Sequence, residues 1–81
     1  MSLVELTEKI VKSLVKDEDS VSVKEFESEE DEVTIEIIVS ENEAGALIGK
    51  SGKTINSIRT ILQDSSYLKD NKKVKVNITT F

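Results

Sequence analysis

Apolar residues recur at two spacings along this chain, and each spacing predicts a different kind of element. In residues 3–16, leucine, isoleucine and valine return every three or four positions, which predicts an amphipathic helix. Ser2 followed by Glu5 forms a capping-box pattern at its start. In residues 33–39 apolar and polar residues alternate, which predicts a central strand with one face under helices. The inward positions of this strand are Val33, Ile35, Ile37 and Val39.

The remaining elements are shorter or less regular. The alternation over residues 21–26 slips between Val23 and Phe26, which indicates a bulge or an edge strand, and the acidic run over residues 28–32 predicts a hairpin turn. Ile38 breaks the polar face of the central strand, either as part of the core or as part of an apolar binding surface. The other predicted elements are a short helix over 43–48, a longer helix over about 52–64, a loop over 65–71 and a last strand over 73–78.

Length and composition exclude several classes of function. The chain has 81 residues and neither cysteine nor histidine, so it lacks disulfides, thiolate metal sites and the commonest general base. No apolar run approaches the length of a membrane span, and no secretory signal opens the chain. We therefore expect one small cytoplasmic domain over residues 1–81, with no membrane contact, no cofactor, no metal and no enzymatic activity.

The net charge of −5 is unevenly distributed along the sequence. Residues 1–43 contain fourteen Asp and Glu against four Lys, and residues 44–81 contain seven Lys and Arg against two Asp. The first part therefore carries a charge of −10 and the second a charge of +5. Such an asymmetry points to an electrostatic partner for the second part.

The candidate chemistry lies in residues 47–55, where two glycines stand three positions apart between aliphatic residues. This pattern predicts a helix end, a tight turn and the start of a second helix. Gly49 would allow the left-handed conformation that closes the first helix, and Gly52 would allow the close approach of another backbone. The second helix then begins with free backbone N–H groups, and Lys50 and Lys53 add positive charge, a combination that suits a phosphate.

The same run also reads like the end of a P-loop, which binds a nucleoside triphosphate, because Gly52 is followed by Lys53 and Thr54. That motif requires a glycine at the position of Leu47, and Gly45 lies two residues too early. A chain of 81 residues also has no room for the rest of a nucleotide-hydrolysing domain. The triphosphate interpretation is therefore rejected.

The run over 47–55 resembles the GxxG loop of KH domains, in which an aliphatic residue and an isoleucine precede the first glycine and an aliphatic residue follows the second. These positions are filled by Leu47, Ile48, Gly49, Gly52 and Ile55. With its element order of helix, strand, strand, helix, helix and strand, the chain is similar over essentially its whole length to the KhpA-like family of small stand-alone bacterial KH proteins. One departure is Lys53, where such proteins often carry arginine.

The resemblance implies an α+β fold consisting of a single type II KH-like domain of order α-β-β-α-α-β. Its three-stranded sheet would be mixed, because the two strands that flank the GxxG helices run parallel and are joined by a right-handed crossover. All three helices would cover one face of this sheet.

The resemblance also implies that the loop binds about four nucleotides of single-stranded RNA or DNA. The backbone N–H groups of Lys50, Ser51 and Gly52 would contact phosphates, and Arg59 would contact the nucleic-acid backbone or cap the helix face. Bases would lie over an aliphatic groove, for which Ile38 is a further candidate that also fits the core. The residues assigned to RNA binding are Ile48, Gly49, Lys50, Ser51, Gly52, Lys53, Ile55 and Arg59.

Aromatic residues are few, and Phe26, Tyr67 and Phe81 all lie away from the loop in sequence, so we expect weak binding with little base preference. Useful affinity would then require avidity. The resemblance implies a homodimer, or a heterodimer with a second KH-containing RNA-binding protein, and a role as an RNA chaperone or post-transcriptional regulator. The alternative is a KH-shaped protein-interaction module that acts mainly through dimerisation or a partner protein.

Overall fold

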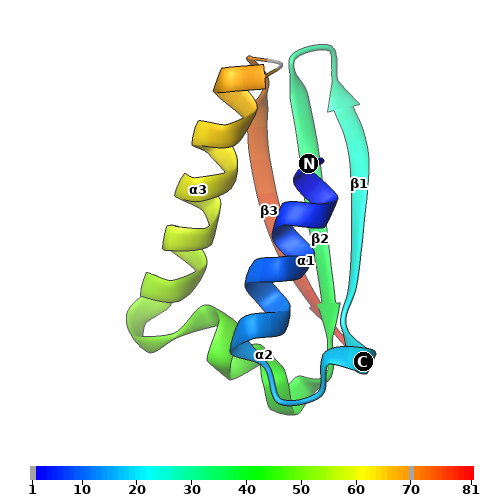
Figure 1. Ribbon diagram of the computed structural model, residues 1–81, viewed down its shortest axis with the longest axis vertical. Coiled ribbons are helices and arrows are strands. Elements are labelled where there is room, and N and C mark those ends of the chain that lie inside the picture. The colour runs from blue at the N-terminus through cyan, green and yellow to red at the C-terminus, as the bar shows by residue number, and fades with distance from the viewer. Residues whose placement is uncertain (1, 70) are drawn as a thin grey trace.

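The computed structural model describes residues 2–69 and 71–81, without the side chains of residues 28 and 29. Its helices and strands follow the predicted order α-β-β-α-α-β (Figure 1). The described helices are α1 (Leu3–Leu14), α2 (Glu41–Ile48) and α3 (Lys53–Lys69), and the strands are β1 (Ser22–Glu29), β2 (Glu32–Val39) and β3 (Lys73–Thr80). Single 3-10 turns span Glu18–Ser20 and Lys50–Gly52.

The described sheet is three-stranded and mixed, as predicted. β2 lies in the middle, antiparallel to β1 and parallel to β3. Alternate residues of β2 from Val33 to Val39 are buried, and all three helices cover that face of the sheet (Figure 1). The connection from β2 to β3 passes through α2 and α3, because two parallel neighbours require a crossover. The predicted α+β arrangement is therefore confirmed.

The core is an aliphatic cluster between the sheet and the helices. Val11 of α1, Leu47 of α2, and Ile58 and Leu62 of α3 are each at most 2% exposed. Full burial of such a side chain stabilises the folded state by about 1.5–3 kcal/mol. These contacts hold α2 and α3, and with them the loop that joins the two helices, against the sheet.

The bounds of all three helices differ from the prediction, and α2 begins at Glu41 rather than at residue 43. α3 continues to Lys69, through residues that were predicted as a loop. Ser66 is buried in this part of α3, and its hydroxyl donates to the carbonyl of Lys72 (2.7 Å), so its polar group is satisfied without ending the helix. α1 ends at Leu14 rather than at residue 16, because Val15 has an extended backbone (φ −100°, ψ 158°).

β1 is an edge strand, one of the two alternatives predicted for this segment, and its bulge lies outside residues 21–26. The bulge falls between Glu27 and Glu29, whereas β1 pairs regularly with β2 from Ser22 to Glu27. Val23 packs against the core, but Phe26 pairs with Thr34 on the other face of the sheet and is 48% exposed. The slip in the apolar pattern therefore reflects an exposed phenylalanine on the open face of an edge strand.

The predicted capping box at the start of α1 is present. Ser2 Oγ accepts a hydrogen bond from the N–H of Glu5 (3.1 Å), and the Glu5 carboxylate accepts one from the N–H of Ser2 (3.4 Å). The bond from the backbone of Ser2 is the main cause that lowers the pKa of Glu5 below its ordinary value, and the Ser2 side chain adds to this effect.

We expect the stabilisation from Glu5 to be present above the unfolded-state pKa of its carboxyl group and to be lost as the pH falls through the lower folded-state pKa. Glu5→Gln keeps an acceptor for the N–H of Ser2 but does not titrate. Urea unfolding at several pH values gives the free energy of unfolding of both proteins. The unmodified chain should exceed the variant by most near neutral pH, and this difference should shrink in acid. A difference that does not change with pH would contradict the assignment.

Candidate nucleic-acid interface

The segment between α2 and α3 is a single 3-10 turn, Lys50–Gly52, with positive φ angles within and before it. Gly49 has φ 73° and ψ −176°, a combination that is essentially restricted to glycine. Its N–H donates to the carbonyl of Gly45 (2.9 Å) and closes α2. Ser51 (φ 58°, ψ 27°) and Gly52 (φ 76°) follow with positive φ. The chain therefore turns sharply and begins α3 at Lys53.

Gly49 closes α2 with a positive φ, as predicted, but the close approach predicted for Gly52 occurs at Gly49 instead. A Cβ atom on Gly49 would overlap the side chain of Thr54, whose own Cβ would lie only 2.7 Å away. At Gly52 the nearest atoms to an added Cβ are 4.0 Å away, so only the positive φ requires glycine there. The prediction that Gly52 allows a close approach is wrong. Gly49 allows the close approach, and the group that approaches is mainly a side chain.

Two backbone N–H groups of the turn are free. Within residues 2–69 and 71–81, the N–H groups of Lys50 and Ser51 have no hydrogen-bond partner, and both residues are exposed. The N–H of Gly52 donates to the carbonyl of Gly49 at 3.5 Å, and that of Lys53 to the carbonyl of Lys50. Of the three N–H groups predicted to contact phosphate, two are therefore free and that of Gly52 makes a long internal bond.

The apolar residues predicted to lie beside the loop have different environments. Ile48, at the end of α2, is 44% exposed, whereas Ile55 is partly buried and packs against the core. Ile38 lies on the open face of the sheet, paired with Ser22 and Thr79 of the neighbouring strands. Because the loop joins helices on the opposite face, Ile38 belongs neither to the helix-covered core nor to a groove beside the loop.

One apolar residue near these helices was not among the predicted binding residues. Ile78 lies on the helix-covered face of the edge strand β3 and is only partly buried, and both α2 and α3 contact β3. The period-two spacing of β3 correctly placed Ile78 inward. That spacing does not distinguish a fully buried position from a half-buried one at the edge of the sheet.

Arg59 lies on the side of α3 that faces β3. Gln63, one turn further along the helix, donates to the carbonyl of Lys72 and accepts from the N–H of Val74 (2.9 Å each), which turns this side of α3 toward the start of β3. Arg59 is exposed, and one guanidinium N–H donates to the side-chain oxygen of Asn56 (3.2 Å). This bond orients the guanidinium and leaves it further donors.

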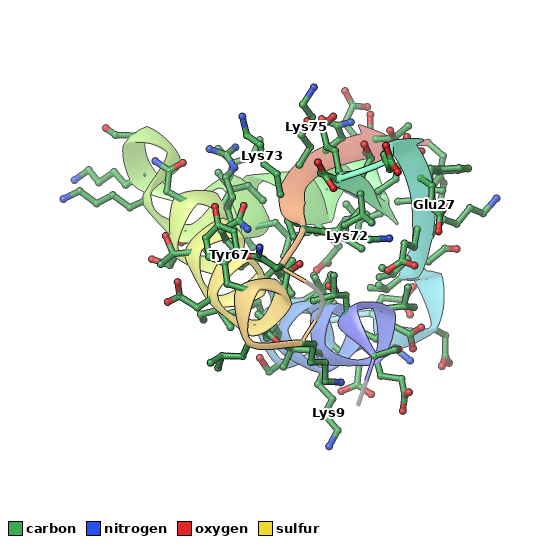
Figure 2. The ribbon with its side chains drawn as sticks, turned by 90° about the horizontal axis from the view of Figure 1, so that it is seen from above. Lys9, Glu27, Tyr67, Lys72, Lys73 and Lys75 are labelled. Carbon is green, nitrogen blue, oxygen red and sulfur yellow. The ribbon has the colours of Figure 1, made fainter. Side chains whose placement is uncertain are left out.

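The basic second part of the sequence does not form one basic surface. β3 begins beside the β1–β2 hairpin, toward the end of the molecule opposite to the loop (Figure 1). Lys73 and Lys75, labelled in Figure 2, lie at this start of β3, paired with Glu32 and Thr34 of β2. Lys75 forms an ion pair with Glu32 (3.2 Å), and Lys72 lies 4.0 Å from Glu27. The basic residues in the loop and the first half of α3 are Lys50, Lys53 and Arg59.

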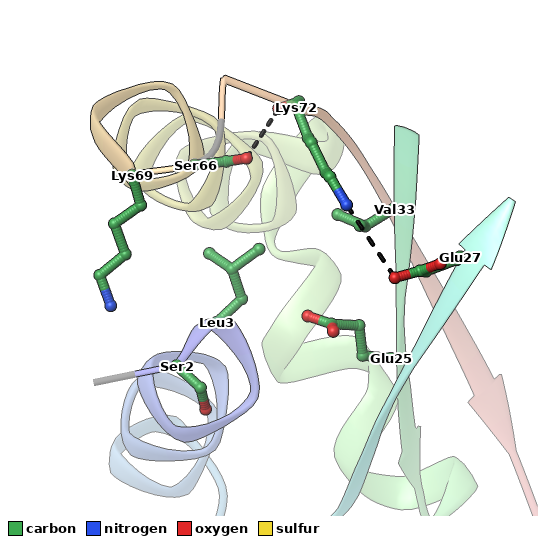
Figure 3. A pocket seen from close by; sticks show the side chains of 8 residues that line it. All are labelled: Ser2, Leu3, Glu25, Glu27, Val33, Ser66, Lys69 and Lys72. Atoms are coloured by element: carbon green, nitrogen blue, oxygen red, sulfur yellow. Dashed lines mark hydrogen bonds and ion pairs between the residues drawn. The ribbon is translucent and has the colours of Figure 1, made fainter. Parts of the chain in front are cut away.

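A surface hollow of about 280 Å³ lies at the hairpin end, between the start of α1, the end of α3 and β1 (Figure 3). Leu3 and Val33 supply apolar atoms to its lining. Glu27 and Lys72 face each other across it at 4.0 Å, and Ser66 is bonded to the carbonyl of Lys72. The hollow is thus remote from the GxxG loop, and several of its polar groups are already partnered.

The described residues provide neither a membrane-spanning helix nor a cluster of metal ligands. Among residues 2–69 and 71–81, no helix is both long enough and apolar enough to cross a membrane. The same part of the chain brings no three acidic side chains together in a cluster suited to a metal ion. The candidate interface consists of the GxxG loop and the first turns of α3, where Lys50, Lys53 and Arg59 lie.

The family model and the relatives that match this chain all belong to one family. A family model described as KhpA/KhpB, KH domain matches residues 4–78. RNA-binding protein KhpA of Thermotoga maritima is 39% identical over 74 residues, which cover 91% of this chain and 95% of that protein. RNA-binding protein KhpA of Clostridium perfringens is 42% identical over 74 residues, which cover 91% of this chain and 96% of that protein. The similarity therefore extends over nearly the full length of both relatives.

Two solved structures share the fold. Era of Aquifex aeolicus bound to GDP·AlF4− matches with a TM-score of 0.66 and 22% identity, over 96% of this chain and 31% of that chain. Era in complex with MgGDPNP and nucleotides 1506–1542 of 16S ribosomal RNA matches with a TM-score of 0.67 and 22% identity, over 96% of this chain and 30% of that chain. The chain thus spans just under a third of the Era chains, and the likeness confirms the predicted type II KH-like fold.

Alanine substitutions of three glycines should separate their roles. Gly45 is exposed inside α2 with nothing within 4 Å of an added Cβ, so Gly45→Ala should raise the free energy of unfolding by about 0.5–1 kcal/mol. Gly52→Ala should lower it by about 1–2 kcal/mol because of the positive φ. Gly49→Ala adds the overlap with Thr54 to a torsional cost of about 1–3 kcal/mol, so it should be the most destabilising. Urea unfolding tests this order, and equal losses for Gly49→Ala and Gly52→Ala would contradict it.

Proposed function

The chain belongs to the KhpA/KhpB family of KH domains, and we propose that it binds single-stranded RNA by clamping the phosphate backbone in its GxxG loop. The observation that supports this proposal best is the pair of free N–H groups of Lys50 and Ser51 in an exposed turn. Relatives that match nearly the whole chain are named as RNA-binding proteins. Family membership also confirms the prediction that the chain is a binding domain and not an enzyme.

Phosphate binding would rest on donors that are already in place in the free protein. The turn leaves the N–H groups of Lys50 and Ser51 without a partner among the described residues, at the N-terminal end of α3, where the helix dipole favours an anion. Lys50 and Lys53 form no ion pair within the described residues, so their ammonium groups do not have to break a contact before they attract phosphate. Charge therefore contributes much of the binding energy, and affinity should fall as salt rises.

The bases would lie in the strip between the loop and β3. Ile48 is exposed, and Ile55 and Ile78 are partly buried against the core, so we propose that the bases contact these three side chains. Arg59 would contact the nucleic-acid backbone along the same side of α3. Tyr67 lies near the far end of α3 (Figure 2), so aromatic stacking would not contribute beside the loop. Contacts to phosphate and base, without an aromatic platform, would give little sequence preference, and single-stranded DNA is expected to bind as well.

We propose that such a weak module acts in the cytoplasm through avidity, as a homodimer or as a heterodimer with a second KH-containing RNA-binding protein. Its role would be RNA chaperoning or post-transcriptional regulation. The alternative, a protein-interaction module that keeps the KH shape, is favoured by one observation. On α3, Leu68 is 88% exposed and Ile61 is 47% exposed, which leaves apolar surface for a protein partner.

A charge-reversed loop tests RNA binding directly. Lys50→Asp with Ser51→Asp places carboxylates beside the free N–H groups, and we expect this variant to bind labelled single-stranded RNA at least about tenfold more weakly, since hydrogen bonds to charged groups contribute about 1.5–3 kcal/mol each. Lys9→Asp with Asn42→Asp makes the same change in net charge at exposed positions on α1 and at the start of α2, away from the loop.

Fluorescence anisotropy measures the affinities, and circular dichroism checks that both variants are folded. Equal weakening by the two variants would point to net charge rather than to the loop. If neither the unmodified chain nor the variants bind RNA, the clamp proposal fails and the protein-interaction module becomes the better account.

The salt dependence should identify which lysines contact phosphate. Each phosphate contact to a single strand contributes about −0.7 to the slope of log affinity against log salt. Lys53→Gln should therefore make this slope less negative by about 0.7, whereas Lys73→Gln, at the start of β3 beside the hairpin, should leave it unchanged. Titrations at several salt concentrations measure both slopes, and an equal change for the two variants would place the RNA elsewhere.

A further inference from the structure

Thr54 occupies the space that Gly49 leaves open. Its Oγ1 and Cβ are the nearest atoms to the position that a Cβ on Gly49 would take. Thr54 lies in the first turn of α3, and helical side chains lean toward the N-terminus of their helix, so its side chain reaches back toward the loop. It is half-buried there, against the residue immediately before Lys50. The hydroxyl is thus placed at the base of the turn that presents the free N–H groups.

The Thr54 hydroxyl has no hydrogen-bond partner among the described residues. Serine and threonine hydroxyls inside helices commonly donate to the carbonyl of the preceding turn, and Ser57 and Thr60 of α3 do so (3.0 Å each). At Thr54 the corresponding carbonyl is that of Lys50, which accepts the N–H of Lys53 instead. Among the described residues no buried side-chain oxygen lacks a partner, so the unpartnered Thr54 hydroxyl is open to solvent and free to bond a ligand.

We infer that the Thr54 hydroxyl is a third donor to the phosphate held by the loop, next to the N–H groups of Lys50 and Ser51. The inference rests on the proposed function, because it assigns a further contact within the same site. An O–H donor to a phosphate oxygen makes a charge-assisted hydrogen bond, which is stronger than a bond between neutral groups. It also gives Gly49 a second purpose, since a side chain at that position would displace the hydroxyl from the turn.

Isosteric substitution separates the hydroxyl from the shape of the side chain. Thr54→Val keeps the branched shape and removes the hydroxyl, so we expect it to bind single-stranded RNA roughly tenfold more weakly than the unmodified chain. Thr54→Ser keeps the hydroxyl and should bind within about twofold of the unmodified chain. Thr60→Val is the matched control, because the Thr60 hydroxyl already donates to a carbonyl of α3 (3.0 Å), and its affinity should not change.

Fluorescence anisotropy gives the affinities, and urea unfolding gives the stability of each variant. Unchanged affinity for Thr54→Val overturns the inference, as does an equal loss for Thr54→Ser, which would show that the methyl group matters instead. If Thr54→Val does not fold, Thr54→Ser and Thr54→Ala form a second pair that differs only in the hydroxyl, and equal affinities in that pair overturn the inference. Normal binding by Thr54→Val, with loss in the charge-reversed loop, would leave the proposed function intact.

Discussion

The parallel pairing of β2 with β3 is the constraint on which the rest of the structure depends. Parallel neighbours cannot be joined by a hairpin, so the chain must cross over the sheet, and here it does so through α2 and α3. Burial of Leu47, Ile58 and Leu62 fixes both helices to one face. The turn that joins them must therefore lie outside the core, where its N–H groups are accessible to a ligand.

The torsions of that turn determine which groups it presents. Gly49 adopts a conformation that other residues avoid and leaves room for Thr54, while Ser51 keeps a positive φ that costs a non-glycine residue about 1–3 kcal/mol. The buried helices on both sides hold this conformation in the absence of a ligand. The N–H groups of Lys50 and Ser51 are thus preorganised, so binding would lose little free energy to ordering the loop.

Charge in this protein is organised by position in space rather than along the sequence. The molecule extends 34 Å along its longest axis, and the acidic β1–β2 hairpin and the GxxG loop lie toward opposite ends of it (Figure 1). Screening at physiological salt acts over about 8 Å, so the hairpin would oppose phosphate binding at the loop only weakly. Its carboxylates act locally, where Glu32 pairs with Lys75 and Glu27 approaches Lys72. The net charge of −5 is therefore a poor guide to the loop.

The sequence by itself determined the elements whose signals are local. Period-two spacing identified β2, three- and four-residue spacing identified α1, and the glycine pattern identified the loop between α2 and α3. These signals suffice because the periodicity of a helix or strand decides which of its faces is apolar. The residues assigned to RNA binding remain a prediction.

Only the tertiary structure decided the features that depend on distant residues. The bond from Ser66 to the carbonyl of Lys72 accounts for a longer α3, strand register put Ile38 on the open face, and the hairpin supplied partners for lysines counted as basic surface. The free N–H groups of the turn and the position of Thr54 against Gly49 likewise depend on torsions that no local spacing specifies. The physical reason is that sequence spacing fixes the faces of an element, whereas packing fixes which faces meet.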